Sequence, residues 1–296
     1  MTDLNTLQRR WEQDFAEHDT ARRELQEKAT PLQARAEKFR AEKPKGLWGK
    51  LSHAFNKVTG QALLGRKIRK LERKMHNRSA AIFDAAHEAY RGLGETALSN
   101  LTNGDTFRRD YAGLTQSLAL LSATQGEVRN AIEQCEGASN METMDAFSNN
   151  KGISLMSYME TSEASDAIKS AKRSLDKLQR ELQEVPQLHH DVDGLKFDNN
   201  IGLALDMIGG MGGMFMSLSN KRDLDRAAQQ LRAVSQDLGK IGDALDHSRD
   251  EILTLAISVG RKWDGGINAF AEALSPHLPR DVAQGMAPKN IKGFSL

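Results

Sequence analysis

The chain has 296 residues, of which 39% are hydrophobic, 5% aromatic and 27% charged, with six prolines and one cysteine. The lone Cys135 excludes an internal disulfide, and scarce proline suits long helices, because proline disrupts a helix interior. The net charge of +1 conceals two opposite blocks: thirteen Lys/Arg against two acids between Lys38 and Arg78, and thirteen acids against seven bases over residues 136–206. Such a basic block faces either an acidic part of its own fold or an anionic partner.

The first segment is one helical stripe of apolar residues from Leu4 to Phe39, with Arg and Glu on the other faces. Pro31 is expected to kink this helix or divide it in two, and residues 43–46 to end it. The first fifteen residues are charged and lack the apolar centre of a secretory signal. We therefore expect a protein that is cytoplasmic when soluble, or one that is exported without a signal peptide or associates with membranes.

A short amphipathic segment follows from Gly46 to Leu64. One helical face carries the apolar side chains and the lysines lie elsewhere, which is typical of helices at a membrane interface. The candidate membrane-binding residues here are Trp48, Leu51, Phe55, Val58, Lys50 and Lys57. The alternative is an ordinary helix that docks on a bundle by its Trp48 face.

Further helices are predicted from Leu64 to Leu93, ending at Gly92, Gly94 and residues 100–104, and from Phe107 to Cys135. The first of these is densely basic over residues 66–78, so non-specific nucleic-acid binding is a minor hypothesis. No base-reading motif accompanies it, and nucleic acid is therefore an unlikely partner. Residues 137–152 are predicted to be a connector with one helical turn. We interpret Cys135 as a small core residue rather than a reactive thiol.

The longest apolar run, residues 199–219, contains Asp206 as its only charge. It is marginal in length for a transmembrane helix, and its four glycines weaken a single helix. It fits either a bundle core or a tongue that is covered in the soluble form and released onto a bilayer. The candidate membrane-binding residues of this apolar tip are Ile201, Leu203, Met207, Ile208, Met211, Met214, Phe215 and Met216.

Segments with helical periodicity flank the tip. The downstream one keeps a seven-residue spacing, which favours a left-handed coiled coil. Its seam consists of Leu224, Leu231, Leu238, Leu245, Ile252 and Val259. The upstream segment, from Glu163 to Val185, is expected to run antiparallel to it, and the seam serves either this hairpin or an oligomer.

The predicted fold class is all-α: an elongated antiparallel helical bundle, or coiled-coil hairpin, with an apolar tip. The chain is predicted to divide into four parts. These are N-terminal helices over residues 1–136, which include the basic amphipathic segment 46–78, a connector over 137–152, the coiled-coil hairpin over 153–264 and a C-terminal tail over 265–296. The sequence contains no recognisable set of catalytic residues and no nucleotide-binding loop. His189, His190, Asp191 and Asp193 are of metal-binding type, but adjacent residues of a helix point about 100° apart, so the four side chains cannot converge on one ion. We therefore predict neither an enzyme, nor a cofactor, nor a metal.

The layout of a signal-less helical chain with an apolar insertion at a hairpin apex resembles the α-helical pore-forming toxins of the cytolysin A type. The resemblance covers residues 153–263 and is one of layout, without a shared motif. It implies a lipid membrane as partner, a tongue stored against the bundle and a homo-oligomer in the bilayer. The competing hypothesis is a cytosolic coiled-coil scaffold that binds a partner protein through the tip.

Overall fold

A computed structural model describes residues 4–41, 47–147, 151–184 and 221–289, and every regular element in these ranges is a helix. The all-α prediction is confirmed. The chain divides into two compact units, one of residues 1–104 with 253–296 and the other of residues 105–252. The boundary at 252 arises because the last turns of one long helix pack with the N-terminal helices. The predicted divisions 1–136, 137–152, 153–264 and 265–296 stay predictions.

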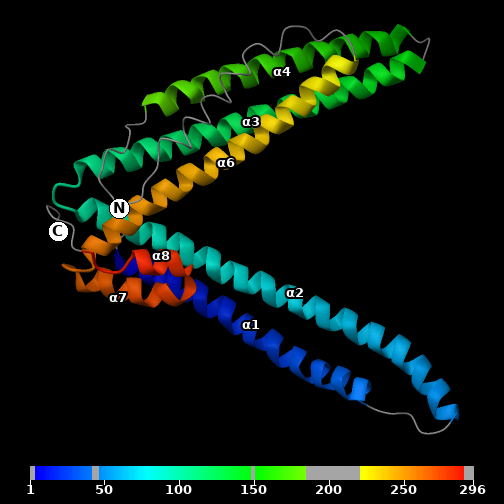
Figure 1. Cartoon of the computed structure of the whole chain (residues 1–296), viewed down its shortest axis with the longest axis vertical. Helices are drawn as coiled ribbons and strands as arrows, with labels where there is room; N and C mark the ends of the chain where they lie inside the picture. Colours follow the sequence, from blue (N-terminus) through cyan, green and yellow to red (C-terminus); the bar gives the residue numbers. More distant parts are fainter. Residues whose placement is uncertain (1–3, 42–46, 148–150, 185–220, 290–296) are drawn as a thin grey trace. The chain divides into compact units, whose positions relative to one another are not determined.

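The first unit is built on a hairpin of α1 (Leu4–Ala41) and α2 (Leu47–Asn100), drawn in blue and cyan in Figure 1. The two helices are antiparallel: Arg10 of α1 contacts Glu88 of α2, whereas His18 contacts Arg78. Of the two alternatives expected at Pro31, a kink or a division, the division is excluded, because α1 is one helix and Pro31 lies inside it. α2 continues from the amphipathic segment through the basic one and past Gly92 and Gly94, and it ends at Asn100, where the predicted 100–104 stretch begins.

The glycines of α2 serve close helix packing instead of termination. A Cβ atom on Gly94 would lie 2.6 Å from the Cβ of Leu253, and one on Gly92 would lie 2.8 Å from a methyl carbon of Leu7. α6 (Lys221–Gly260) supplies Leu253 and passes close to α2 there. The missing side chain at Gly94 therefore permits a contact that alanine would block, whereas alanine at position 92 would displace only the methyl end of Leu7.

We expect Gly94→Ala to destabilise the protein by about 1–3 kcal/mol, the range for overpacking a core. Gly126→Ala is the matched control, because that helical glycine has open space around its Cβ position. The control should instead stabilise its helix by about 0.5–1 kcal/mol. Urea unfolding followed by circular dichroism measures both, and equal shifts in the two variants would refute the close approach of α2 and α6.

The C-terminal elements complete the first unit: α7 (Gly265–Leu274), the 3-10 turn η2 (Ser275–His277) and α8 (Arg280–Gly285). The Asp264 side chain caps α7 by accepting hydrogen bonds from the backbone N–H groups of Gly266 and Ile267, at 2.8 and 3.2 Å. Ile267, Phe270 and Leu274 then fill the core of this unit.

The second unit is a bundle of α3 (Asp105–Phe147), α4 (Lys151–Glu184) and the part of α6 up to Ile252 (Figure 1). The predicted connector 137–152 is mostly helix, because α3 extends to Phe147 and α4 begins at Lys151. The expected hydrophobic rows form the core. The buried members of α4 are Ala164, Ile168, Ala171, Leu175, Leu178 and Leu182, and those of the α6 seam in this unit are Leu224, Leu231, Leu238, Leu245 and Ile252. The last seam residue, Val259, is buried in the first unit.

The predicted antiparallel pairing of the two rows is wrong. α4 is antiparallel to α3, since Glu181 bonds to Gln116 whereas Ser174 bonds to Thr124. α6 is also antiparallel to α3, since Asp225 bonds to Ser139 whereas Gly242 lies beside Leu121. α4 and α6 therefore run in the same direction. The apolar tip between them, residues 199–219, lies outside the described residues.

Candidate functional site

The most distinctive surface in the described part of the chain is a cationic face on α2. It comprises six exposed side chains, Arg66, Lys67, Arg69, Lys70, Arg73 and Lys74. None of the six forms an ion pair with another described residue. Glu72 is the only acid among residues 62–78, which include seven Lys/Arg.

The helical register explains why these side chains are exposed. α2 packs through the row Leu64, Ile68, Leu71 and Met75, which are all half-buried. At about 100° per residue, the six cations spread over an arc of about 160° centred nearly opposite that row. The face that α2 turns away from α1 is therefore positive.

The facing part of α1 does not neutralise this charge. Residues 22–38 of α1, with residues 62–78 of α2, form what we call the cationic arm, which extends beyond the contact of His18 with Arg78. The α1 part carries five Lys/Arg and three acids, and the α2 part seven and one, so the arm has an excess of eight positive charges. Such a concentration attracts anionic partners over a Debye length, about 8–10 Å in physiological salt.

The arm also has almost no buried core. Ala29 is the only buried residue among the described residues of the arm, because two helices alone cannot shield the apolar rows of both helices from water. Leu63 is 60% exposed and adjoins the cations. The arm therefore presents an apolar side chain together with its positive charges.

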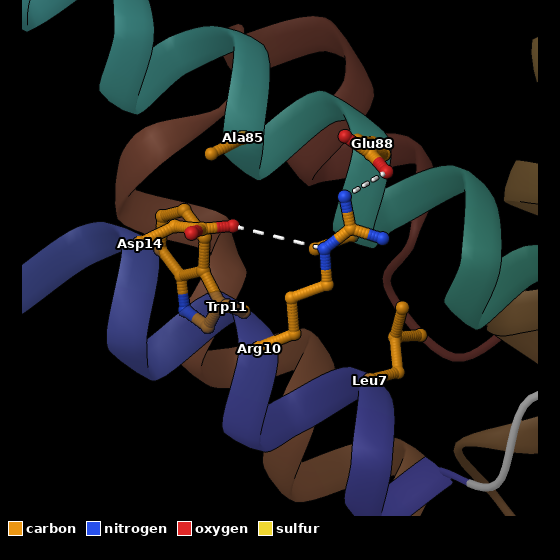
Figure 2. A pocket seen from close by; sticks show the side chains of 7 residues that line it. Leu7, Arg10, Trp11, Asp14, Ala85 and Glu88 are labelled. Atoms are coloured by element: carbon orange, nitrogen blue, oxygen red, sulfur yellow. Dashed lines mark ion pairs between the residues drawn. The ribbon is translucent and has the colours of Figure 1, made fainter.

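The cations at the base of the hairpin are, by contrast, satisfied within the fold. Figure 2 shows Arg10 between Glu88, at 3.0 Å, and Asp14, at 3.9 Å. The small pocket that these residues line with Leu7, Trp11, Ala85 and Ala89 has free space of about 10 Å³, enough for about one water molecule. It is too small for an organic ligand.

A second cluster at the base holds the C-terminal turn against α1. The ring of His277 lies 5.4 Å from that of Trp11 and 4.7 Å from that of Phe15. Burial lowers the pKa of His277, and Arg22 adds to this effect while Asp19 opposes it. A hydrogen bond from Arg22 lowers the pKa of the buried Asp19 carboxyl, which also pairs with Arg23 at 2.7 Å.

We expect acidification to loosen this cluster. Because the pKa of His277 is lower in the folded than in the unfolded chain, its contribution to stability is complete above about pH 6.5 and falls as the pH drops below that value. Urea midpoints at pH 7.5 and 5.5 measure the loss. His277→Phe keeps a ring and should reduce the pH dependence, whereas the exposed His76→Gln should not. An unchanged pH dependence in His277→Phe would contradict this role.

The other predicted site residues fall into three groups. Trp48, Leu51, Phe55, Val58, Lys50 and Lys57 lie in the helical backbone of α2, but their side chains are outside the described part. Ile201, Leu203, Met207, Ile208, Met211, Met214, Phe215 and Met216 lie wholly outside it. The six seam residues of α6 are buried within this single chain.

Cys135 is a core residue, as interpreted: it is fully buried, and burial raises the pKa of its thiol to about 11. The clusters around His277 and around Arg261 were not predicted. The guanidinium of Arg261 donates to Asn268, at 2.8 Å, and to the carbonyl of Met286, at 3.1 Å. Nothing local in the sequence signals these contacts.

Within the described ranges, no helix has both the length and the apolarity needed to cross a bilayer. Nor do these ranges place three or more His, Cys, Asp or Glu side chains around a common metal position. The chain matches no protein-family model, no characterised protein and no solved structure. The resemblance to cytolysin A-type toxins therefore stays a prediction.

Proposed function

We propose that the protein binds anionic membrane surfaces through the cationic arm. The observation that carries the proposal is the set of six exposed cations on α2 that form no ion pair with a described residue. Each Lys or Arg near an anionic bilayer contributes about 1 kcal/mol to binding, so a face of this size is sufficient for peripheral attachment. No other described surface combines exposed cations in this number without interleaved acids.

A membrane fits this face better than a nucleic acid does. The exposed Leu63 beside the cations would contribute to burial in lipid but gain little on a phosphate backbone. The same helix begins with the amphipathic segment from Leu47, so the apolar and cationic stretches belong to one continuous helix. Interfacial helices use this combination of apolar insertion and electrostatic attraction.

Pore formation is the further step that we propose for residues 199–219. In this scheme the arm brings the protein to the bilayer, and the apolar tip then leaves its covered state and enters the lipid. The support is the sequence of the tip, too apolar to remain exposed in water. Attachment does not depend on this second step.

Flotation with liposomes, combined with dye leakage, tests both steps. We expect the protein to float with vesicles that contain phosphatidylserine and not with pure phosphatidylcholine, and to lose binding in high salt. Binding with leakage supports a pore former, and binding without leakage supports peripheral attachment alone. Equal affinity for neutral and anionic vesicles, or binding to neither, would refute the proposal and favour a cytosolic scaffold.

A further inference from the structure

The two broad faces of the hairpin of α1 and α2 can be followed along its length, because both helices pack in seven-residue repeats. The inward row of α2 keeps a three-four spacing from Leu64 to Ala89, and every member is buried or half-buried. α1 likewise has buried or half-buried residues at sevens from Trp11 to Leu32. Arg10 and Glu88 pair across the hairpin at 3.0 Å, so these two positions mark one of its broad faces (Figure 2).

Steps of three and four residues from this pair reach the cationic arm on the same face. We call the ten residues that they reach there the lysine face: Leu63, Lys67, Lys70, Lys74 and Asn77 of α2, with Glu24, Lys28, Pro31, Arg35 and Lys38 of α1. All ten are exposed. They include six cations and one acid, so both helices contribute to an excess of five positive charges.

The other broad face of the arm carries no such excess. It consists of the positions that follow the two inward rows by one residue, and its Lys, Arg, Asp and Glu residues are Arg69 and Glu72 of α2 with Arg23 and Glu37 of α1. The formal charge of these four residues is zero, and Arg23 already pairs with Asp19 at 2.7 Å. An anionic surface therefore attracts the lysine face more strongly than the opposite one.

We infer that the arm lies on an anionic bilayer with its lysine face, so that α1 as well as α2 contacts the lipid. The inference rests on the proposed function and adds to it the contacting face and the part played by α1. The ligands are the phosphate and carboxylate groups of anionic lipid headgroups. A bilayer is flat over the size of the arm, and two helices packed side by side can both touch a flat surface only along a broad face.

The apolar surface of the arm supports the same orientation. Leu63, 60% exposed, is the one large apolar side chain that is strongly exposed among the described residues of the arm. It is in register with Lys67 and Lys70, four and seven residues later. The lysine face thus combines an apolar side chain with cations, as interfacial helices do.

The remaining cations of α2 lie farther from a bilayer in this orientation. Arg66, Arg69 and Arg73 form a row about 100° around the helix from the row of three lysines. For a helix about 10–12 Å in diameter, this places them about 6 Å farther from the lipid, more than half a Debye length in physiological salt. The arginines therefore contribute less than the lysines, although an isolated guanidinium binds phosphate better than an ammonium does.

Two triple variants with the same change of charge test the orientation: Lys67→Gln with Lys70→Gln and Lys74→Gln, and Arg66→Gln with Arg69→Gln and Arg73→Gln. Partitioning is measured on vesicles of phosphatidylcholine with phosphatidylserine, and circular dichroism confirms that both variants are folded. The lysine variant should bind more than 100-fold more weakly than the unaltered protein, and the arginine variant about tenfold more weakly. Side-chain chemistry alone predicts the reverse order.

A double variant tests the contact of α1. Lys28→Gln with Lys38→Gln should weaken binding by about tenfold, since both cations lie on the lysine face. The matched control, Lys169→Gln with Lys177→Gln on α4, should change binding by less than about threefold. Equal effects of these two double variants would overturn the contact of α1.

A fluorophore attached through a cysteine gives a second measure of the orientation. Leu63→Cys places the label on the lysine face, whereas Ala62→Cys places it about 100° away and about 6 Å farther from the lipid, still within reach of the interface through the tether. Both labels should shift to the blue with anionic vesicles, and the label at position 63 should shift more. The reverse order would overturn the orientation.

Equal losses in the two triple variants, or a larger loss in the arginine variant, would also overturn the inference while leaving the proposed function intact. If the unaltered protein binds no anionic vesicle, the proposed function fails together with the inference. Tighter binding of a short DNA duplex than of vesicles in the same buffer would overturn the assignment of the lysine face to lipid.

Discussion

Replacing all six cations of the α2 face by glutamine should reduce binding to anionic vesicles by about 10⁴-fold, which is effectively to background. The six side chains are exposed and unpaired with described residues, so their loss removes attraction to the bilayer and little else. At about 1 kcal/mol for each Lys or Arg near the surface, and about 1.4 kcal/mol for each tenfold, the summed effect has this size. Vesicle partitioning at fixed salt measures it.

The control for this variant uses four exposed cations on α4, namely Lys169, Arg173, Lys177 and Arg180. Asp166 and Asp176 share the helical face of these four residues, and Lys169 lies 2.9 Å from Asp166, so acids interrupt the positive charge there. Their replacement by glutamine should change partitioning by less than about threefold. A comparable loss in both variants would mean that total charge, and not the α2 face, determines attachment.

Leu238→Ala and Leu245→Ala should each lower the free energy of unfolding by about 2–5 kcal/mol, the range for a leucine truncated in a core that cannot collapse around the cavity. Both side chains are 1% exposed. They belong to the part of α6 that packs in the second unit against α3. A domain is stable by about 5–15 kcal/mol in total, so either variant loses a large fraction of that stability.

Gln236→Ala is the control, because Gln236 is exposed on the same helix and its removal should cost almost nothing. Urea unfolding followed by circular dichroism at 222 nm, a helix-specific wavelength, compares the three variants. Equal midpoints for Leu238→Ala and Gln236→Ala would show that the seam is not a core. The two units need not unfold together, so a transition of the second unit alone would still report the effect.

The helices and their buried rows could be predicted because both depend on local spacing. Every seam residue from Leu224 to Val259 is buried where the seven-residue pattern places it. The direction of packing could not be predicted in the same way, since a heptad row fits a parallel or an antiparallel neighbour equally well. The chain between α4 and α6, residues 185–220, is long enough to permit either arrangement.

Contacts between distant segments account for the remaining differences. The rings of Trp11, Phe15 and His277 meet although most of the chain separates them, and no local pattern marks His277 as their partner. Gly92 and Gly94 were predicted to end a helix, but their role is to admit Leu7 and Leu253. The positive charge of the cationic face could be predicted from the sequence. Its exposure and its lack of described ion-pair partners could not, because both depend on how α1 packs on α2.

The most direct test of membrane attachment by α2 is an environment-sensitive fluorophore placed on the exposed face of α2 that carries the six cations. Ala62→Cys introduces an exposed thiol there, and Ala119→Cys an exposed thiol on α3. The buried Cys135, with a thiol pKa of about 11, should not react in the folded protein. With phosphatidylserine vesicles we predict a blue-shifted, brighter signal from the label at position 62 and an unchanged signal from the label at position 119. An unchanged signal at position 62, while the protein floats with the vesicles, would contradict attachment through this face of α2.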